Sequence, residues 1–273
     1  MKFAIIGGTH GNEPVGIKVM QEMKSIDSTQ FLHDYEAFLG NPKAYEIGKR
    51  YVDSDLNRSF GSLGESKGYE QQRSSELSKT IKGNFDFILD LHTTTSNMGL
   101  TLILTSLDQN SVNAACYLKS KIPEIKIIIS VRAGENCPYT SSLASSAITV
   151  EVGPVANNVL KTQLILDTYK IVTETLNYDF KSSYDYSQIE CFKTVGFKSY
   201  PESGEWMLHP NIDGNDFSPL NNEDPLFINM NNEVILYEGE TVYPLFVNEA
   251  AYQENNTAME YAKKTTLDKI LKR

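Results

Sequence analysis

The sequence predicts an α/β protein: a mostly parallel or mixed sheet flanked by helices, with a smaller β-rich domain after it. In residues 1–180, apolar runs of strand length alternate with segments of helical length, which is typical of a parallel sheet. Later in the chain, short apolar runs alternate with turns rich in Asn, Gly and Pro. The stretch 181–186 is polar and aperiodic, so we place the domain boundary there, giving domains 1–180 and 181–273.

The strands of the first domain are predicted from apolar runs. The chain opens with the apolar run 2–7, which leads into a Gly-Gly pair. Segment 85–91 is apolar almost throughout and predicts a buried strand. Segment 147–152 is also apolar except for a glutamate and a threonine. The other predicted strands of this domain are 35–39, 100–105 and 125–131.

Helices are predicted between these strands and after the last of them, as parallel strands require crossover connections. Their predicted ranges are 14–25, 69–82, 108–121 and 157–177. In the second domain, the apolar runs 226–230 and 234–236 predict short strands, and 258–271 is predicted as a final helix.

The composition limits the partners of the protein. The net charge of -10 opposes nucleic-acid binding, which requires a basic surface. No apolar stretch approaches the length of a membrane span, and the chain opens on a strand rather than a signal peptide. Cys116, Cys137 and Cys191 are odd in number and widely spaced, which indicates reduced thiols. We therefore expect a cytoplasmic protein that contacts neither nucleic acid nor a membrane; a homo-oligomer is compatible with the sequence.

A candidate metal site lies where the first strand ends. Gly7-Gly8 permits a sharp turn, after which His10 and Glu13 are three residues apart. An imidazole and a carboxylate are two of the three protein ligands of a His2Glu zinc site. Without a third ligand, the segment is equally a glycine-rich turn that caps a helix.

His92 supplies the third candidate ligand, because it follows the buried strand 85–91 and precedes a polar loop. Asp90 lies two residues earlier and on the same face of the strand, so it is placed to orient His92. The alternative is a buried aspartate that caps a loop. We expect the two remaining histidines, His33 and His209, to be structural.

Two further segments carry candidate site residues. The segment 50–58 contains Arg50, Asn57 and Arg58; arginine grips carboxylates bidentately, and Asp55 is placed to hold an arginine. The alternative is a solvated surface loop. Glu151 stands in an apolar strand, where a carboxylate is costly unless it is paired or belongs to a site. It is either a general base and acid for zinc-bound water or the partner of a lysine.

These motifs together resemble those of the aspartoacylase family, within the larger group of zinc carboxypeptidase-like hydrolases. The resemblance covers nearly the whole chain. It rests on the segments 7–13, 41–44, 50–58, 90–99 and 151–154 and, in the C-terminal part, on 209–211, 241–244 and 247–252.

The resemblance implies zinc-dependent hydrolysis of an N-acyl-L-aspartate, with N-acetyl-aspartate as the type substrate. It implies one zinc ion per chain, held by His10, Glu13 and His92. Glu151 would shuttle the proton, and Arg50 would polarise the scissile carbonyl. Asn57 and Arg58 would grip a substrate carboxylate. Tyr252, from the C-terminal domain, would complete the substrate pocket and narrow the cleft.

One position departs from the family pattern. Animal aspartoacylases have an arginine for the substrate side chain ten residues before the proton-shuttling glutamate, and this chain has Ser141 there. Arg132 is the candidate replacement. The alternatives are therefore a deacylase for another N-acyl amino acid, of the succinylglutamate desuccinylase or aromatic type, and an inactive binding protein on the same fold. The acyl group and the oligomeric state are not determined by the sequence.

Overall fold

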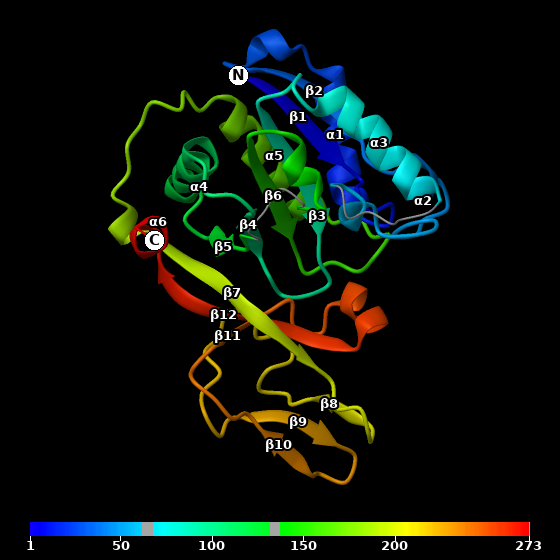
Figure 1. The fold of residues 1–273 in the computed structure, drawn as a ribbon, viewed down its shortest axis with the longest axis vertical. Helices are drawn as coiled ribbons and strands as arrows, with labels where there is room; N and C mark the ends of the chain where they lie inside the picture. Colours follow the sequence, from blue (N-terminus) through cyan, green and yellow to red (C-terminus); the bar gives the residue numbers. More distant parts are fainter. Residues whose placement is uncertain (62–67, 132–136, 273) are drawn as a thin grey trace.

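The computed structural model describes residues 1–61, 68–131 and 137–272. Across these residues, nine strands form one mixed sheet in the order β11-β12-β7-β5-β4-β6-β3-β1-β2 (Figure 1). Their bounds are β1 (Lys2–Gly7), β2 (Asp34–Leu39), β3 (Phe87–Thr93), β4 (Leu100–Leu104), β5 (Lys126–Ile129), β6 (Ser146–Val152), β7 (Glu190–Ser199), β11 (Tyr243–Leu245) and β12 (Thr257–Thr266). The predicted fold class is confirmed.

The sheet is mixed, and its C-terminal part is antiparallel. Strands β2, β1, β3 and β6 run parallel to one another, whereas β4 runs antiparallel to β6. Strand β5 is parallel to both β4 and β7, and β12 and β11 then extend the sheet antiparallel to β7. The C-terminal domain thus shares the main sheet and adds a small sheet of its own, formed by β8 (Trp206–Leu208), β9 (Pro225–Asn229) and β10 (Val234–Leu236).

The alternation of side chains along the strands separates two cores. Phe3 and Ile5 of β1 pack with the large cluster that includes α1 (Pro14–Ser25), α4 (Gln109–Lys121) and α5 (Thr162–Leu176). Ala4 and Ile6 point to the opposite face, where they pack with Leu77 of α3 (Tyr69–Ile81). Because side chains alternate with period two, each strand contributes one set of residues to the helical core and the other set to the face beside α3.

Two predicted elements differ from the structure. The predicted helix 258–271 is wrong: residues Thr257–Thr266 form β12, and only Leu267–Leu271 is helical, as α6. The ladder of nine residue pairs between β12 and β7 outweighs the local helical tendency of this segment. Helix α5 starts at Thr162 rather than at residue 157, because a turn with Asn158 at a φ of 63° precedes it.

In Figure 1, the long strands β7 and β12 lead from the main sheet to the three-stranded sheet at the opposite end of the molecule. All three cysteines are free thiols, as predicted. Within the described residues, no helix has the length and apolar character that a membrane crossing requires.

Candidate active site and metal centre

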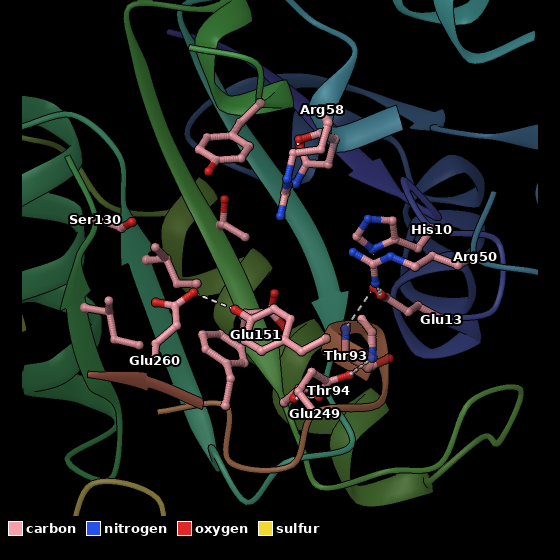
Figure 2. Close-up of a pocket in the computed structure, with 18 of the residues that line it drawn as sticks. His10, Glu13, Arg50, Arg58, Thr93, Thr94, Ser130, Glu151, Glu249 and Glu260 are labelled. Atoms are coloured by element: carbon pink, nitrogen blue, oxygen red, sulfur yellow. Dashed lines mark hydrogen bonds and ion pairs between the residues drawn. The ribbon is translucent and has the colours of Figure 1, made fainter. Parts of the chain in front are cut away.

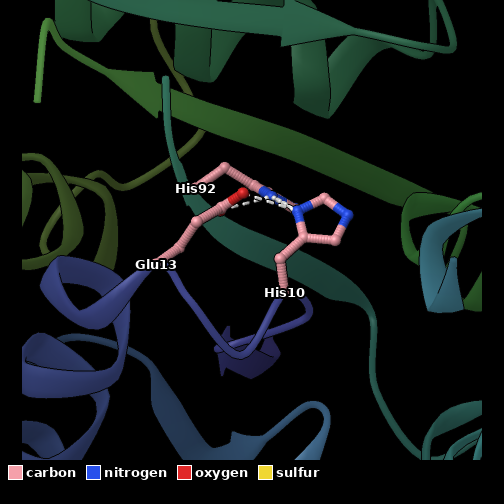
Figure 3. Close-up of side chains that lie close together, drawn as sticks. All are labelled: His10, Glu13 and His92. Carbon is pink, nitrogen blue, oxygen red and sulfur yellow. Dashed lines mark hydrogen bonds and ion pairs between the residues drawn. The ribbon is translucent and has the colours of Figure 1, made fainter. Parts of the chain in front are cut away.

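The first candidate ligands lie on the turn between β1 and α1. Gly8 adopts a φ of 74°, which a side chain would strain, and the chain then reverses into α1. Glu13 is the N-cap residue of α1, but its side chain makes no capping hydrogen bond. Its carboxylate instead faces His10 and His92, as Figure 3 shows.

The three side chains converge on one buried point. The Nδ1 atom of His10 lies 2.7 Å from Oε1 of Glu13, and Nδ1 of His92 lies 3.0 Å from Oε2. The two Nδ1 atoms are 3.2 Å apart. Ligand atoms of all three residues lie within 4.8 Å of one another, and none of the residues is more than 3% exposed. The predicted grouping of these residues is therefore present in the structure.

Each histidine has a carboxylate behind it. Oδ2 of Asp90 lies 2.8 Å from Nε2 of His92, a close ion pair without the alignment of a hydrogen bond. Thr9 donates to the other oxygen of Asp90, at 2.7 Å. Asp55 lies behind His10 in the same way: Oδ1 of Asp55 is 3.2 Å from Nε2 of His10. Such carboxylates fix the orientation of ligand imidazoles and raise their basicity. Asp90 thus occupies the predicted position, whereas the contact of Asp55 with His10 was not predicted.

The electrostatics of this centre favour a cation. Burial alone would lower the pKa of His92, but Asp90 and Glu13 outweigh it and hold the pKa well above its ordinary value. Burial opposes ionisation of Glu13, yet His10 and His92 hold its pKa well below the usual range. Nitrogen and carboxylate donors surrounded by negative charge form the donor set that zinc takes in proteins. The residues present therefore fit the zinc ion that the sequence predicts.

Glu151 lies beside the ligand cluster because of strand register. It pairs with His92 across β6 and β3, and both side chains point to the face away from the helical core. Its Oε2 atom is buried and has no hydrogen-bond partner among the described residues. Burial raises the pKa of Glu151 to about 8, and the charges of Glu13 and Glu249 add to the effect of burial. No described lysine pairs with it, so the alternative of a lysine salt bridge is wrong.

The predicted arginine segment forms the next wall of the site. Arg50 donates through Nη2 to Oδ2 of Asp55, at 3.0 Å, and its Nη1 lies 3.4 Å from Oε1 of Glu13. Asp55 therefore holds an arginine, as predicted. Asn57 accepts from the backbone N–H and the hydroxyl of Thr140, both at 2.9 Å, so its Nδ2 donor is the group that can face a ligand. Arg58 is exposed, with its guanidinium carbon 5.0 Å from the centre of the Tyr139 ring.

One cavity joins these walls. It is lined by His10, Glu13, Arg50, Asn57, Arg58, Glu151 and Tyr252, with Glu260, Glu249, Thr105, Ser130 and Thr149 among its other lining residues. Figure 2 shows Glu260 and Ser130 on the side opposite the metal ligands. The hydroxyl of Tyr252 donates to Oε1 of Glu260 at 2.5 Å. Tyr252 thus lines the same cavity as the predicted ligands His10 and Glu13.

Ser141 is buried beside the cavity. Its hydroxyl lies 2.8 Å from the hydroxyl of Thr105, and Thr105 is one of the residues that line the cavity. A neutral hydroxyl pair thus occupies the position where the family pattern has an arginine. Arg132, the predicted replacement, lies outside the described residues.

Several lining residues were not identified from the sequence. Thr105 and Ser130 lie just beyond the ends of β4 and β5, and Thr149 lies within β6, two residues before Glu151 and on the same face. The alternation of side chains along the strands could have identified them, since they point to the same face of the sheet as His92 and Glu151. Glu249 and Glu260 come from the C-terminal domain, and no local pattern marks them.

The comparisons with known proteins agree with this geometry. Residues 1–178 match the model of the succinylglutamate desuccinylase/aspartoacylase catalytic domain, and residues 187–264 match the barrel-sandwich hybrid domain of the same family. A probable aspartoacylase of Trichodesmium erythraeum is 35% identical, with 97% of this chain and 98% of the relative covered. An N-acyl-aromatic-L-amino acid amidohydrolase of Danio rerio is 32% identical, over 97% of this chain and 93% of the relative.

Among solved structures, murine aminoacylase 3 superposes with a TM-score of 0.88 at 30% identity, covering 98% of this chain and 96% of that chain. The fold and the buried histidine–glutamate cluster thus define the class of metal-dependent amidohydrolases. The chain belongs to the succinylglutamate desuccinylase/aspartoacylase family, whose members act on N-acyl amino acids.

Proposed function

We propose that this protein is a zinc-dependent deacylase that hydrolyses N-acyl-L-amino acids, with N-acyl-L-aspartate as the leading candidate, to a carboxylate and a free amino acid. The observation that carries the proposal is a single cavity lined by the His10–Glu13 pair, two arginines and Glu151. The names of relatives with similar identity support an N-acyl amino acid substrate and include both aspartyl and aromatic types.

In this proposal, His10, Glu13 and His92 hold one zinc ion, which supplies a Lewis acid that activates water at neutral pH. Glu151 takes a proton from the attacking water and returns it to the leaving amine. Its raised pKa suits a group that must hold a proton and release it in one turnover.

The remaining proposed roles concern the substrate. Arg50 faces the metal side of the cavity and would stabilise the charge that develops on the scissile carbonyl oxygen. Asn57 and Arg58 would bind the substrate's α-carboxylate. Tyr252 would form the wall contributed by the domain 181–273, which narrows the cleft to small substrates. The alternative of an inactive binding protein is disfavoured because the proposed metal ligands and the proton shuttle are all present: His10, Glu13, His92 and Glu151.

A second candidate substrate class follows from Ser141. The hydroxyl pair of Ser141 and Thr105 cannot make the charge-assisted contact to a second carboxylate that an arginine makes. N-acyl amino acids with neutral side chains are therefore the alternative substrates.

One assay tests both candidates. The zinc-loaded protein is given N-acetyl, N-formyl and N-succinyl derivatives of aspartate, glutamate, alanine and phenylalanine, and kcat/KM is measured for each. We expect hydrolysis of N-acetyl-aspartate and a neutral N-acetyl amino acid within about two orders of magnitude of one another. Failure of every N-acyl amino acid to react would refute the proposed function.

A further inference from the structure

The segment 41–44 carries part of the family resemblance but has no place in the chemistry proposed above. Asn41 is the N-cap residue of α2 (Pro42–Glu46), and its Oδ1 accepts from the backbone N–H of Ala44 at 3.2 Å. Its Nδ2 donates to Oε1 of Glu70, at 3.0 Å. Both residues are 0% exposed. A buried carboxylate is costly unless its environment compensates for the lost water, so the contacts of Glu70 call for an explanation.

Glu70, in the first turn of α3, is bound to the arginine segment. Its two oxygens accept the backbone N–H groups of Val52 at 2.7 Å, Asp53 at 3.0 Å and Ser54 at 3.2 Å. Burial would raise the pKa of Glu70, but the hydrogen bonds from Asn41 and these backbone groups outweigh it and hold the pKa below its ordinary value. The charged form is therefore the one that the fold stabilises.

The attachment is reciprocal. Asp53 accepts the backbone N–H of Tyr69, the first residue of α3, at 2.7 Å. The start of α3 and residues 52–54 thus hold each other. These three residues connect Arg50 to Asn57 and Arg58, so their position sets where the carboxylate-binding pair sits.

Helix α2, capped by Asn41, also packs on the metal turn. A Cβ atom at Gly11 would lie 2.1 Å from the carbonyl carbon of Ala44, so the helix and the turn are in direct backbone contact. The N–H of Gly11 donates to the carbonyl of Arg50 at 3.1 Å, and that of Lys49 donates to the carbonyl of Ala44 at 3.0 Å. Asn41 therefore connects one element that touches the metal turn to another that holds the arginine segment.

We propose that the Asn41–Glu70 pair is a positioning device that fixes the Asn57–Arg58 carboxylate clamp relative to the metal ligands. Neither residue is among those that line the cavity. The inference rests on the proposed function, because it assigns the clamp to the substrate α-carboxylate. A displacement of about 1 Å in such a group costs on the order of 10²-fold in rate, so a rigid attachment has a clear catalytic use.

The test compares wild type with Glu70→Gln and with the control Glu76→Gln. The substitution at Glu70 replaces one acceptor oxygen by an N–H2 group that faces backbone N–H donors. Glu76 lies on the same helix, and its side chain is 64% exposed and paired with Arg73. Zinc content, kcat and KM are measured for N-acetyl-alanine and for its α-carboxamide, which the clamp cannot bind as an anion.

In Glu70→Gln we expect the preference for the acid over the amide to fall by about 10- to 100-fold, mainly through KM, with zinc content unchanged. Glu76→Gln should keep the wild-type preference. An equal loss for acid and amide, a loss of zinc, or a change in thermal stability alone would overturn the inference, since a purely structural role predicts those results.

Two further measurements keep the test decisive. Should Glu70→Gln fail to fold, Asp53→Ala removes the reciprocal bond from an exposed side chain; we expect a smaller loss of the same preference, and an unchanged preference overturns the inference. Should wild type hydrolyse no N-acyl amino acid at all, the proposed function fails. The Kd ratio of acid to amide, measured by calorimetry on the zinc-loaded proteins, then decides the positioning role alone.

Discussion

Two regions face each other across the cavity, and they are built in different ways. On the metal side, the ends of β1, β3 and β6 deliver the reacting groups, and strand register places His92 beside Glu151. On the opposite side, the segment between β11 and β12 is held by side chains. Glu249 accepts hydrogen bonds from Thr94 and from the backbone N–H of Thr95, 154 residues earlier in the chain.

The difference separates chemistry from selectivity. The metal side is fixed by the backbone hydrogen bonds of a sheet, which hold their geometry within narrow limits. The C-terminal side is a docked segment that brings Tyr252 to the cavity, where its hydroxyl donates to Glu260 of β12. Substitutions on the metal side should therefore abolish the reaction, whereas substitutions on the other walls should change which substrate is preferred.

The largest effect is expected from His92→Ala, which removes a ligand from the rigid side. We expect less than about a tenth of one zinc per chain and a loss of at least about three orders of magnitude in kcat/KM, since the metal supplies several kcal/mol of stabilisation. Elemental analysis and the N-acyl amino acid assay measure both. The control His209→Ala, in the C-terminal domain, should keep its zinc. One zinc per chain in His92→Ala would show that His92 is not a zinc ligand.

The second effect concerns Glu151→Gln, which keeps the shape of the side chain but cannot accept a proton. We expect kcat to fall by about two to four orders of magnitude, the range for general acid–base groups, with zinc content unchanged. Glu124→Gln, a change at an exposed glutamate before β5, is the control and should behave as wild type. An active Glu151→Gln, or one that has lost its metal, contradicts the proposed role.

The same contrast explains how much the sequence could predict. His10 and Glu13 were identified because they follow a strand, and His92 because it stands near the end of another; the carboxyl ends of parallel strands meet at one edge of a sheet. Glu151 was identified because a carboxylate is unusual in an apolar strand. These signals are local, so they can be read from one segment at a time.

Glu70 and Glu249 were missed because their partners lie in other segments. The N–H groups bound by Glu70 belong to residues 52–54, and those bound by Glu249 belong to the loop after β3. Strand β12 was predicted as a helix for a similar reason, since its ladder partner β7 determines its conformation. Contacts between distant segments leave no periodicity in the sequence.

The third prediction concerns Ser141, beside the part of the cavity that we expect to determine substrate preference. Ser141→Arg should raise the kcat/KM ratio of N-acetyl-aspartate to N-acetyl-alanine by about 10- to 100-fold, because a charge-assisted contact contributes roughly 1.5–3 kcal/mol. Ser142→Arg, one residue along, is the matched control and should leave the ratio unchanged. The comparison includes Arg132→Ala: if wild type already strongly prefers the aspartyl substrate and this variant abolishes the preference, the expected relaxed selectivity is wrong.

The smallest effect is expected where the C-terminal domain docks on the loop after β3. Asp216 accepts the backbone N–H of Asn97 at 3.1 Å and that of Val247 at 3.0 Å. Burial raises its pKa to about 6, above the ordinary value of 3.8, against the lowering effect of these N–H groups. The folded state therefore binds this proton more tightly than the unfolded state does. The contribution of Asp216 to stability is full below about pH 4 and falls as the pH rises towards 6 and beyond.

Asp216→Asn removes this titration, so the Tm of the variant minus that of wild type should rise by a few degrees between about pH 4.5 and pH 7. The control Asp213→Asn changes an exposed carboxylate nearby and should show no such trend. Thermal unfolding of the three proteins at several pH values measures it. A Tm difference that is independent of pH would contradict the raised pKa of Asp216 in the folded protein.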